Sequence, residues 1–181
     1  MVFLVIAALL ALAVWVVLTR RRLRDLSENV DTALNQIGLQ LSSLFRAVAA
    51  LQNLAEGQGI LTLPEPKIPT VDARSSPIHV LEQEQRLSEA MRSLSAASES
   101  CPALTADPAW GKCVEAARCY GRMVRTSSLI YNDSVSRFNR TLERPFTRLI
   151  AGRLGFAPRE YLSFTPDAWP LPAPGPHTQA S

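Results

Sequence analysis

The sequence predicts an all-α protein in which an N-terminal transmembrane helix is followed by an antiparallel three-helix bundle of long helices. Three observations support this prediction. The chain begins with an uncharged apolar run, its later apolar residues recur in steps of four and three, and no stretch shows the alternation typical of a β-strand. A seven-residue rhythm keeps one side of a helix turned toward packed neighbours.

Residues 1–19 are predicted to form the membrane anchor. They contain no charged side chain, and about 18–20 helical residues span the roughly 30 Å hydrocarbon core of a bilayer. A cleaved signal peptide would need a basic region before a shorter apolar run. We therefore expect a single-pass anchor that stays attached to the chain.

A cluster of arginines follows the anchor at once and predicts its orientation. The positive-inside rule places this cluster and the body of the protein in the cytoplasm, with the N-terminus outside the cell membrane. The same cluster favours contact with anionic lipid headgroups. Its members are Arg20, Arg21, Arg22 and Arg24.

The net charge and the cysteines indicate which partners and which covalent or metal sites to expect. The formal net charge is +3, and the arginines beside the anchor more than account for it, so the body is near neutral and gives no support to a nucleic-acid partner. Cys101, Cys113 and Cys119 are an odd number without a CxxC motif. Reduced thiols packed on helices are favoured over a disulfide or a zinc site.

The first long helix of the bundle is predicted over residues 20–56, without a proline to interrupt it. Gly57 and Gly59 are stop signals, and several prolines then make residues 57–77 a Pro/Gly-rich linker. The predicted core residues of this helix are Leu23, Val30, Leu34, Ile37, Leu41, Leu44, Val48, Leu51 and Ala55.

The remaining bundle helices are predicted within residues 78–162. Ser76 followed by Pro77 begins the first of them, which extends to about Ser98, and Asp107 followed by Pro108 begins the next. Pro145 breaks or kinks that second helix. Its predicted core residues are Trp110, Val114, Ala117, Gly121, Val124, Ser128, Tyr131, Val135, Phe138 and Leu142.

The last part of the chain is predicted to hold little regular structure. A short apolar helix over Phe146–Leu154 ends at Gly155. In residues 163–181 prolines alternate with small residues, which predicts a disordered Pro-rich tail.

Two C-terminal motifs resemble those of the LemA family. The first reads Tyr131-Asn132-x-x-Val135-x-x-Phe138-Asn139, and the second reads Leu149-Ile150-Ala151-Gly152-x-x-Gly155-Phe156-x-Pro158-x-x-Tyr161. Residues 29–41 are similar to the first-helix motif of that family. The resemblance implies a helical bundle on a membrane anchor and implies no established reaction.

The chain departs from the family pattern in four places and is identified as a divergent member. The terminal Tyr-Phe pair of the family reads Tyr161-Leu162 here. Ser42 and Ser43 lie where the family usually carries basic residues and a Pro-Asn pair. The Phe-Pro pair before the last helix is inverted to Pro145-Phe146. The proline-rich segment 57–77 replaces a helical middle.

The residue inventory does not favour catalysis. The two histidines, His79 and His177, lie beside the linker and in the tail, and the chain has no HExxH, GxSxG or Glu-x-x-His motif. We therefore expect no enzymatic activity, no cofactor and no metal.

The residues that we single out for interaction or helix register come from the two C-terminal motifs. Asn132 and Asn139 share one helical face, which favours a polar layer that fixes register against a partner helix, with a binding groove as the alternative. Tyr131 and Phe138 are expected in the core, and the chain end is expected to fold back on the bundle. The full set is Tyr131, Asn132, Val135, Phe138, Asn139, Phe156 and Tyr161.

These observations predict a non-catalytic interaction or scaffold module on the cytoplasmic side of the membrane, with a protein partner that the sequence does not identify. One alternative is a membrane-linked sensor, in which a ligand between helices, beside Gly121 and Ser128, shifts their packing. The other alternative is a homo-oligomer assembled through the helical seams.

Overall fold

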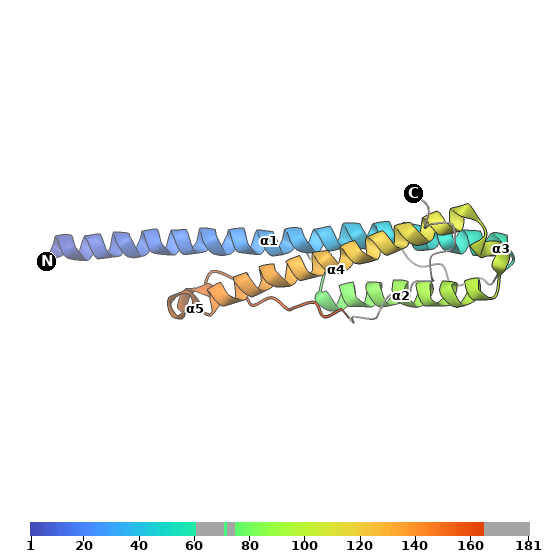
Figure 1. Ribbon diagram of the computed structural model, residues 1–181. Helices are drawn as coiled ribbons and strands as arrows, with labels where there is room; N and C mark the ends of the chain where they lie inside the picture. Colours follow the sequence, from blue (N-terminus) through green and yellow to red (C-terminus); the bar gives the residue numbers. More distant parts are fainter. Residues whose placement is uncertain (61–70, 72–74, 165–181) are drawn as a thin grey trace.

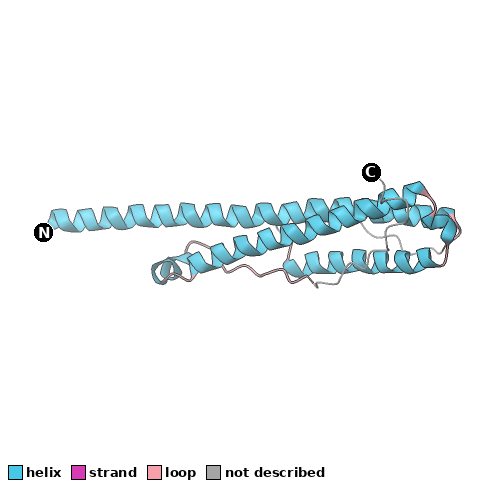
Figure 2. Cartoon of the chain, in the orientation of Figure 1, coloured by secondary structure: helices cyan, strands magenta, loops and turns pink. Residues whose placement is uncertain are grey.

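The computed structural model describes residues 1–60, 71 and 75–164, and within them every regular element is a helix (Figure 2). This confirms the predicted all-α class. Most of the linker 57–77 and nearly all of the tail 163–181 lie outside the described residues. The helices are α1 (Val2–Gly57), α2 (Pro77–Glu99), α3 (Pro102–Thr105), α4 (Pro108–Leu142) and α5 (Pro145–Ala151).

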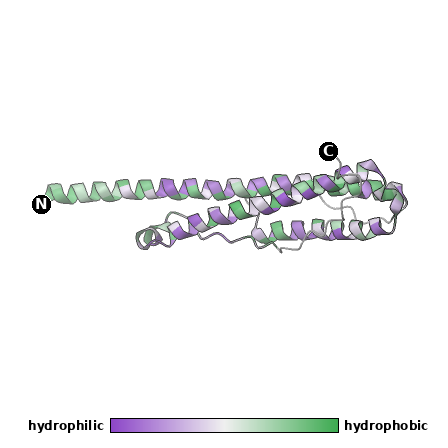
Figure 3. Ribbon diagram, viewed as in Figure 1, coloured by the Kyte–Doolittle hydropathy of each residue, from purple (hydrophilic) through white to green (hydrophobic). Residues whose placement is uncertain are grey.

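α1 is one unbroken helix of 56 residues that joins the apolar N-terminal run to the bundle. Its N-terminal part projects beyond the other helices and is the most hydrophobic stretch of the ribbon (Figures 1 and 3). An 18-residue window in this part is long and apolar enough to cross a membrane, by length and composition, and none of it is buried inside the protein. The buried face of α1 begins at Leu23.

The core lies along the seam between α1 and α4, and α2 packs on α1 beside it. All the core residues predicted for α4, from Trp110 to Leu142, are buried. The same holds for those predicted for α1, from Leu23 to Ala55. The seven-residue rhythm was therefore a sufficient signal for this interface, because both helices keep one face toward the other over many turns.

The predicted antiparallel arrangement is wrong for one of the three helices. α4 runs opposite to α1, but α2 runs in the same direction as α1 (Figure 1). Antiparallel neighbours are expected when connections are short, whereas residues 58–76 separate α1 from α2. Within this range the carbonyl of Val71 lies against Gly38, in the middle of α1. A Cβ atom on Gly38 would collide with that carbonyl.

The helix ends follow the predicted signals. The Asp107 side chain accepts a hydrogen bond from the Ala109 N–H (2.8 Å), and the Ser76 hydroxyl accepts one from the His79 N–H (3.2 Å). α4 ends at Leu142, and Pro145 occupies the first turn of α5.

α5 is shorter than the predicted helix and ends in a reversal of the chain. After Ala151 the backbone turns through Gly155, whose φ of 79° favours glycine, and the Phe156 N–H donates to the Ala151 carbonyl at 3.0 Å. This turn directs the following residues back along α4.

Candidate functional site

The C-terminal strap, residues 156–164, runs back along α4 from α5 (Figure 1). Its first residue, Phe156, meets the buried Phe138 edge to face, with ring centroids 6.3 Å apart and planes at 67°. Near its far end Leu162 is 2% exposed. The strap is thus packed onto the bundle at both ends.

Two asparagines of α4 hold the backbone of the strap. The Asn139 amide nitrogen donates to the Arg159 carbonyl and its oxygen accepts from the Arg159 N–H, both at 2.9 Å. Asn132 makes the same pair with Leu162, at 2.7 Å and 2.9 Å. Each side chain therefore satisfies one donor and one acceptor of an extended segment, as a neighbouring strand would.

This arrangement differs from the register contact against a partner helix that the sequence favoured. A helix interior offers no free backbone groups, because its N–H and C=O groups already pair within the helix. The strap lacks such internal pairs, and a primary amide matches its peptide groups with one donor and one acceptor. The sequence correctly placed both asparagines on one face but could not show what that face contacts.

Tyr131 and Arg159 complete the attachment of the strap. The buried Tyr131 hydroxyl donates to the Glu160 carbonyl at 2.9 Å. Burial raises the pKa of this phenol, against a smaller lowering effect of the nearby Arg159 guanidinium. Arg159 reaches across to α1, where it pairs with Asp31 at 3.0 Å. The strap consequently connects α4 to α1.

The other singled-out residues divide between core and surface. Val135 and Phe138 are buried, and Phe156 is partly buried. Tyr161 is 51% exposed, and the buried side chain beside it is Leu162. Sequence reasoning missed Leu162, Arg159 and Asp31, since a single buried residue in an extended segment leaves no periodic signal.

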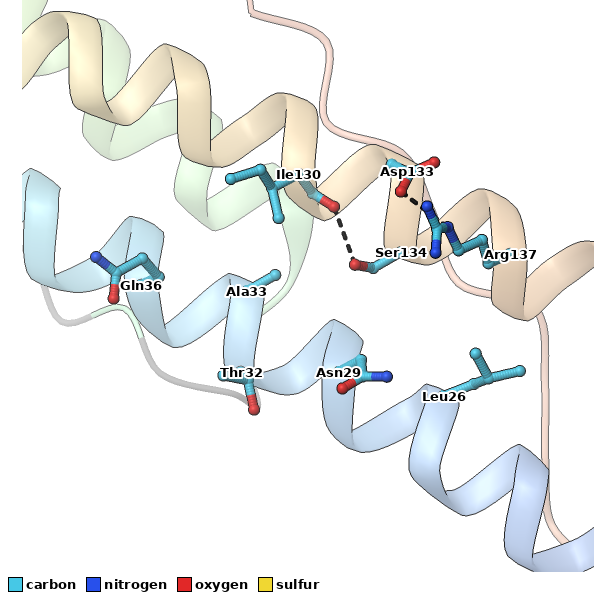
Figure 4. Close-up of a pocket in the computed structure, with 9 residues that line it drawn as sticks. All are labelled: Leu26, Asn29, Thr32, Ala33, Gln36, Ile130, Asp133, Ser134 and Arg137. Atoms are coloured by element: carbon cyan, nitrogen blue, oxygen red, sulfur yellow. Dashed lines mark hydrogen bonds and ion pairs between the residues drawn. The ribbon is translucent and has the colours of Figure 1, made fainter.

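The opposite flank of the α1–α4 seam is an open groove of about 460 Å³ (Figure 4). At about 100° per residue, the groove residues and the strap-binding residues fall on either side of the buried face of each helix. The lining residues are Leu26, Asn29, Thr32, Ala33 and Gln36 of α1 and Ile130, Asp133, Ser134 and Arg137 of α4. We call this cavity the α1–α4 groove.

Among the described residues, the polar side chains that α4 contributes to the groove are bonded only within that helix. Arg137 pairs with Asp133 at 2.9 Å, and the Ser134 hydroxyl donates to the Ile130 carbonyl at 2.9 Å. The Ile130 side chain is 57% exposed at the same place. A small apolar patch surrounded by amide, hydroxyl and charged groups is typical of a surface that contacts another molecule through both kinds of group.

A second cavity of about 300 Å³ lies beside α5, where Arg148, Phe156 and Pro158 contribute to its lining. Gly121 and Ser128, beside which a ligand pocket was predicted, are buried in the seam and line neither of these cavities. Their small side chains instead occupy the helix interface.

The described part of the chain contains no cluster of side chains that could ligate a metal ion. No group of three or more His, Cys, Asp or Glu side chains is placed to hold an ion there. Cys101, Cys113 and Cys119 are free thiols of intermediate exposure.

Comparison with known proteins identifies the family. The family model described as LemA matches residues 13–172, which is most of the chain. Searches of curated proteins and of solved structures gave no match. The matched range covers the greater part of the apolar helix α1, the seam helix α4 and the strap with its asparagine attachments. The chain belongs to the LemA family.

Proposed function

We propose that this protein is a single-pass membrane protein that acts as a non-catalytic interaction module in the cytoplasm, and that the α1–α4 groove contacts a protein partner. The observation that carries the proposal is the continuity of α1. The same helix supplies the apolar N-terminal segment and one wall of the groove, whose first lining residue, Leu26, is close to the arginine cluster. A partner in the groove would be held close to the membrane surface.

The chemistry of the groove supports binding over catalysis. Its lining consists of amides, hydroxyls, apolar side chains and one ion pair, Asp133–Arg137, and it contains no nucleophile beside a general base. Such a mixture resembles the rim and core of a protein interface. Seating the exposed Ile130 there would remove its side chain from water.

Site-specific photocrosslinking in native membranes tests this proposal. A photoreactive amino acid replaces Gln36, which lines the groove, and in the matched control it replaces the adjacent exposed Asn35, which does not line the groove. We expect a discrete adduct from position 36 and none from position 35. Equal labelling from both positions, or none from either, would contradict the groove as the contact surface.

The same experiment separates the proposal from self-assembly, because an adduct of twice the mass of the chain would show that the partner is a second copy. Orientation is tested independently with reporter fusions at the C-terminus. Cytoplasmic reporter activity is expected from the arginines that follow residue 19. Activity on the outer side would overturn the proposed location.

A ligand-responsive sensor is the second candidate function, and the volume of the groove favours it. About 460 Å³ lies within the range of small-molecule sites, and the two walls belong to different helices. A ligand there would bias the packing of α4 against the membrane-linked α1. Its test is a thermal-shift screen of the full chain in detergent with small polar metabolites. Binding to the wild-type groove should be lost on replacement of Thr32, an exposed lining residue, by a bulky residue.

A further inference from the structure

The short helix α5 leaves two large apolar side chains exposed, unlike a helix that packs all its large apolar residues into a protein core. Its buried residues are Thr147 and Ala151, whereas Phe146 is 71% and Leu149 is 76% exposed. Surface helices usually turn their large apolar side chains inward. Scattered exposed apolar residues are ordinary, but two large ones one turn apart on so short a helix form an apolar face that needs a cover.

The structure places α5 beside the C-terminal end of the predicted membrane span. The Phe146 ring meets the Trp15 ring edge to face, with centroids 6.4 Å apart and planes at 85°. Trp15 precedes Arg20 by five residues, which is about 7–8 Å along the helix axis. If Arg20 lies at the headgroups, Phe146 is at the depth where amphipathic interfacial helices bury their apolar faces.

Basic side chains flank this apolar face. Arg144 precedes α5, Arg148 lies within it, Arg153 follows it, and all three are exposed. None of the three forms an ion pair with another residue of the described ranges. At this level they add to the positive charge of the arginine cluster of α1. An apolar face bordered by arginines matches the chemistry of an anionic leaflet.

We propose that α5 is an interfacial membrane-binding helix that inserts Phe146 and Leu149 into the anionic lipid leaflet around the anchor. The bundle then has a second attachment besides α1, located at the end of α4. Because the strap begins directly after α5, this attachment fixes the end of the bundle from which the strap returns. The inference rests on the proposed insertion of residues 1–19 into the membrane.

Lipid-depth fluorescence on the full chain tests this attachment. Single cysteines are introduced as Leu149→Cys, Tyr161→Cys and Leu10→Cys in a background with the native cysteines replaced by alanine, and each is labelled with a polarity-sensitive dye. The proteins are reconstituted into phosphatidylcholine vesicles containing phosphatidylglycerol and lipids that carry a quencher at a shallow or deep acyl position. Circular dichroism confirms that each variant keeps its helix content.

We expect the dye at position 149 to emit at shorter wavelength and to be quenched several-fold more by the shallow lipid than the dye at position 161. Both positions are exposed in the protein, so a difference in lipid quenching between them reports membrane insertion. Equal quenching at 149 and 161 would overturn the proposal. A blue-shifted but unquenched dye at 149 would also overturn it, because another protein surface would then cover α5.

The Leu10 position separates failure of this inference from failure of the anchor. Strong quenching at 10 by the deep lipid together with weak quenching at 149 would reject membrane binding by α5 and leave the anchor intact. Weak quenching at both positions would reject both. Leu10 is exposed within the apolar part of α1, so its dye reports the span itself.

The charge requirement is tested in the Leu149→Cys background with Arg144→Gln and Arg148→Gln together. Quenching at 149 should fall several-fold in vesicles containing phosphatidylglycerol, and the difference from the parent protein should shrink in vesicles of phosphatidylcholine alone. A matched control replaces Arg122 and Arg125, which lie on α4 far from α5 in sequence, and should change nothing. Unchanged quenching in the Arg144/Arg148 variant would overturn the assignment to anionic lipid.

Discussion

The two flanks of the α1–α4 seam present similar residue types but differ in what covers them. On one flank Asn132 and Asn139 bond the backbone of the strap, and Arg159 of the strap reaches Asp31 of α1. On the other flank the polar residues of α4 bond, within the described part of the chain, only to their own helix, and the groove is open. The asparagines of the α4 motif therefore attach the strap to one flank of the seam. The other flank is left uncovered by the strap.

The largest expected effect comes from removing both asparagine attachments. The double variant Asn132→Ala, Asn139→Ala loses four hydrogen bonds to the strap. At about 1 kcal/mol net for each bond, the free energy of unfolding should fall by about 3–5 kcal/mol. Urea denaturation of the full chain in detergent, followed by circular dichroism, measures the change.

The matched control for that variant is Asn29→Ala, Asn35→Ala, in which both asparagines are exposed on α1. Its stability should stay within about 0.5 kcal/mol of the wild type. If the two double variants lost equal stability, the distinction between the flanks would be wrong.

The next effect is expected at the first residue of the strap. Phe156→Ala removes the edge-to-face contact with Phe138. A fully buried Phe→Ala change costs about 3–5 kcal/mol, and we expect about half of that because Phe156 is only partly buried. The melting temperature should fall by several degrees, whereas the exposed control Tyr161→Ala should melt like the wild type. A Phe156→Ala protein that melts with its parent would exclude the aromatic contact as an attachment.

Tyr131→Phe should have a smaller effect that depends on pH. The variant loses the hydrogen bond to the Glu160 carbonyl, at a cost of about 1 kcal/mol near neutral pH. Burial raises the pKa of the Tyr131 phenol above its ordinary value of 10.0. The unfolded chain therefore loses this proton first, so the wild type loses stability as the pH rises above that value, whereas the variant lacks this contribution.

Denaturation at neutral pH and at pH values above 10.0 measures the difference between wild type and variant. The stability advantage of the wild type should shrink as the pH increases. An advantage that grows with pH would show that the phenol is held as the phenolate, against the structure.

The smallest effect on stability is expected in the groove. Ser134→Ala breaks only a bond within α4, and its stability should stay within about 0.5 kcal/mol of the wild type. If the groove is the partner surface, this variant combined with Ile130→Ser should reduce crosslinking from position 36. A large loss of stability with unchanged crosslinking would show that the groove is structural.

The seam was predictable from sequence because its signal repeats. From Leu23 to Ala55 and from Trp110 to Leu142 the predicted core residues recur mostly in steps of three and four, and all of these predicted residues are buried. The caps Ser76 and Asp107 were equally readable, since each is followed by proline at the first helical position.

The structural features that depend on the path of the non-helical segments could not be predicted from the sequence. α2 runs in the same direction as α1, and the proline content of the residues between these helices does not fix that direction. The partners of Asn132 and Asn139 depend on the turn at Gly155, which directs an aperiodic segment onto one flank of α4. The groove likewise exists because the strap covers only the other flank.

Hydrogen exchange at single amides of the strap tests the central claim most directly. In the full chain the N–H groups of Arg159 and Leu162 donate to asparagine side chains, while those of Glu160 and Ser163 have no such partner among the described residues. We predict slow exchange at 159 and 162 and fast exchange at 160 and 163, with the slow pair becoming fast in the Asn132→Ala, Asn139→Ala protein. Uniformly fast exchange across the strap of the wild type would contradict the account.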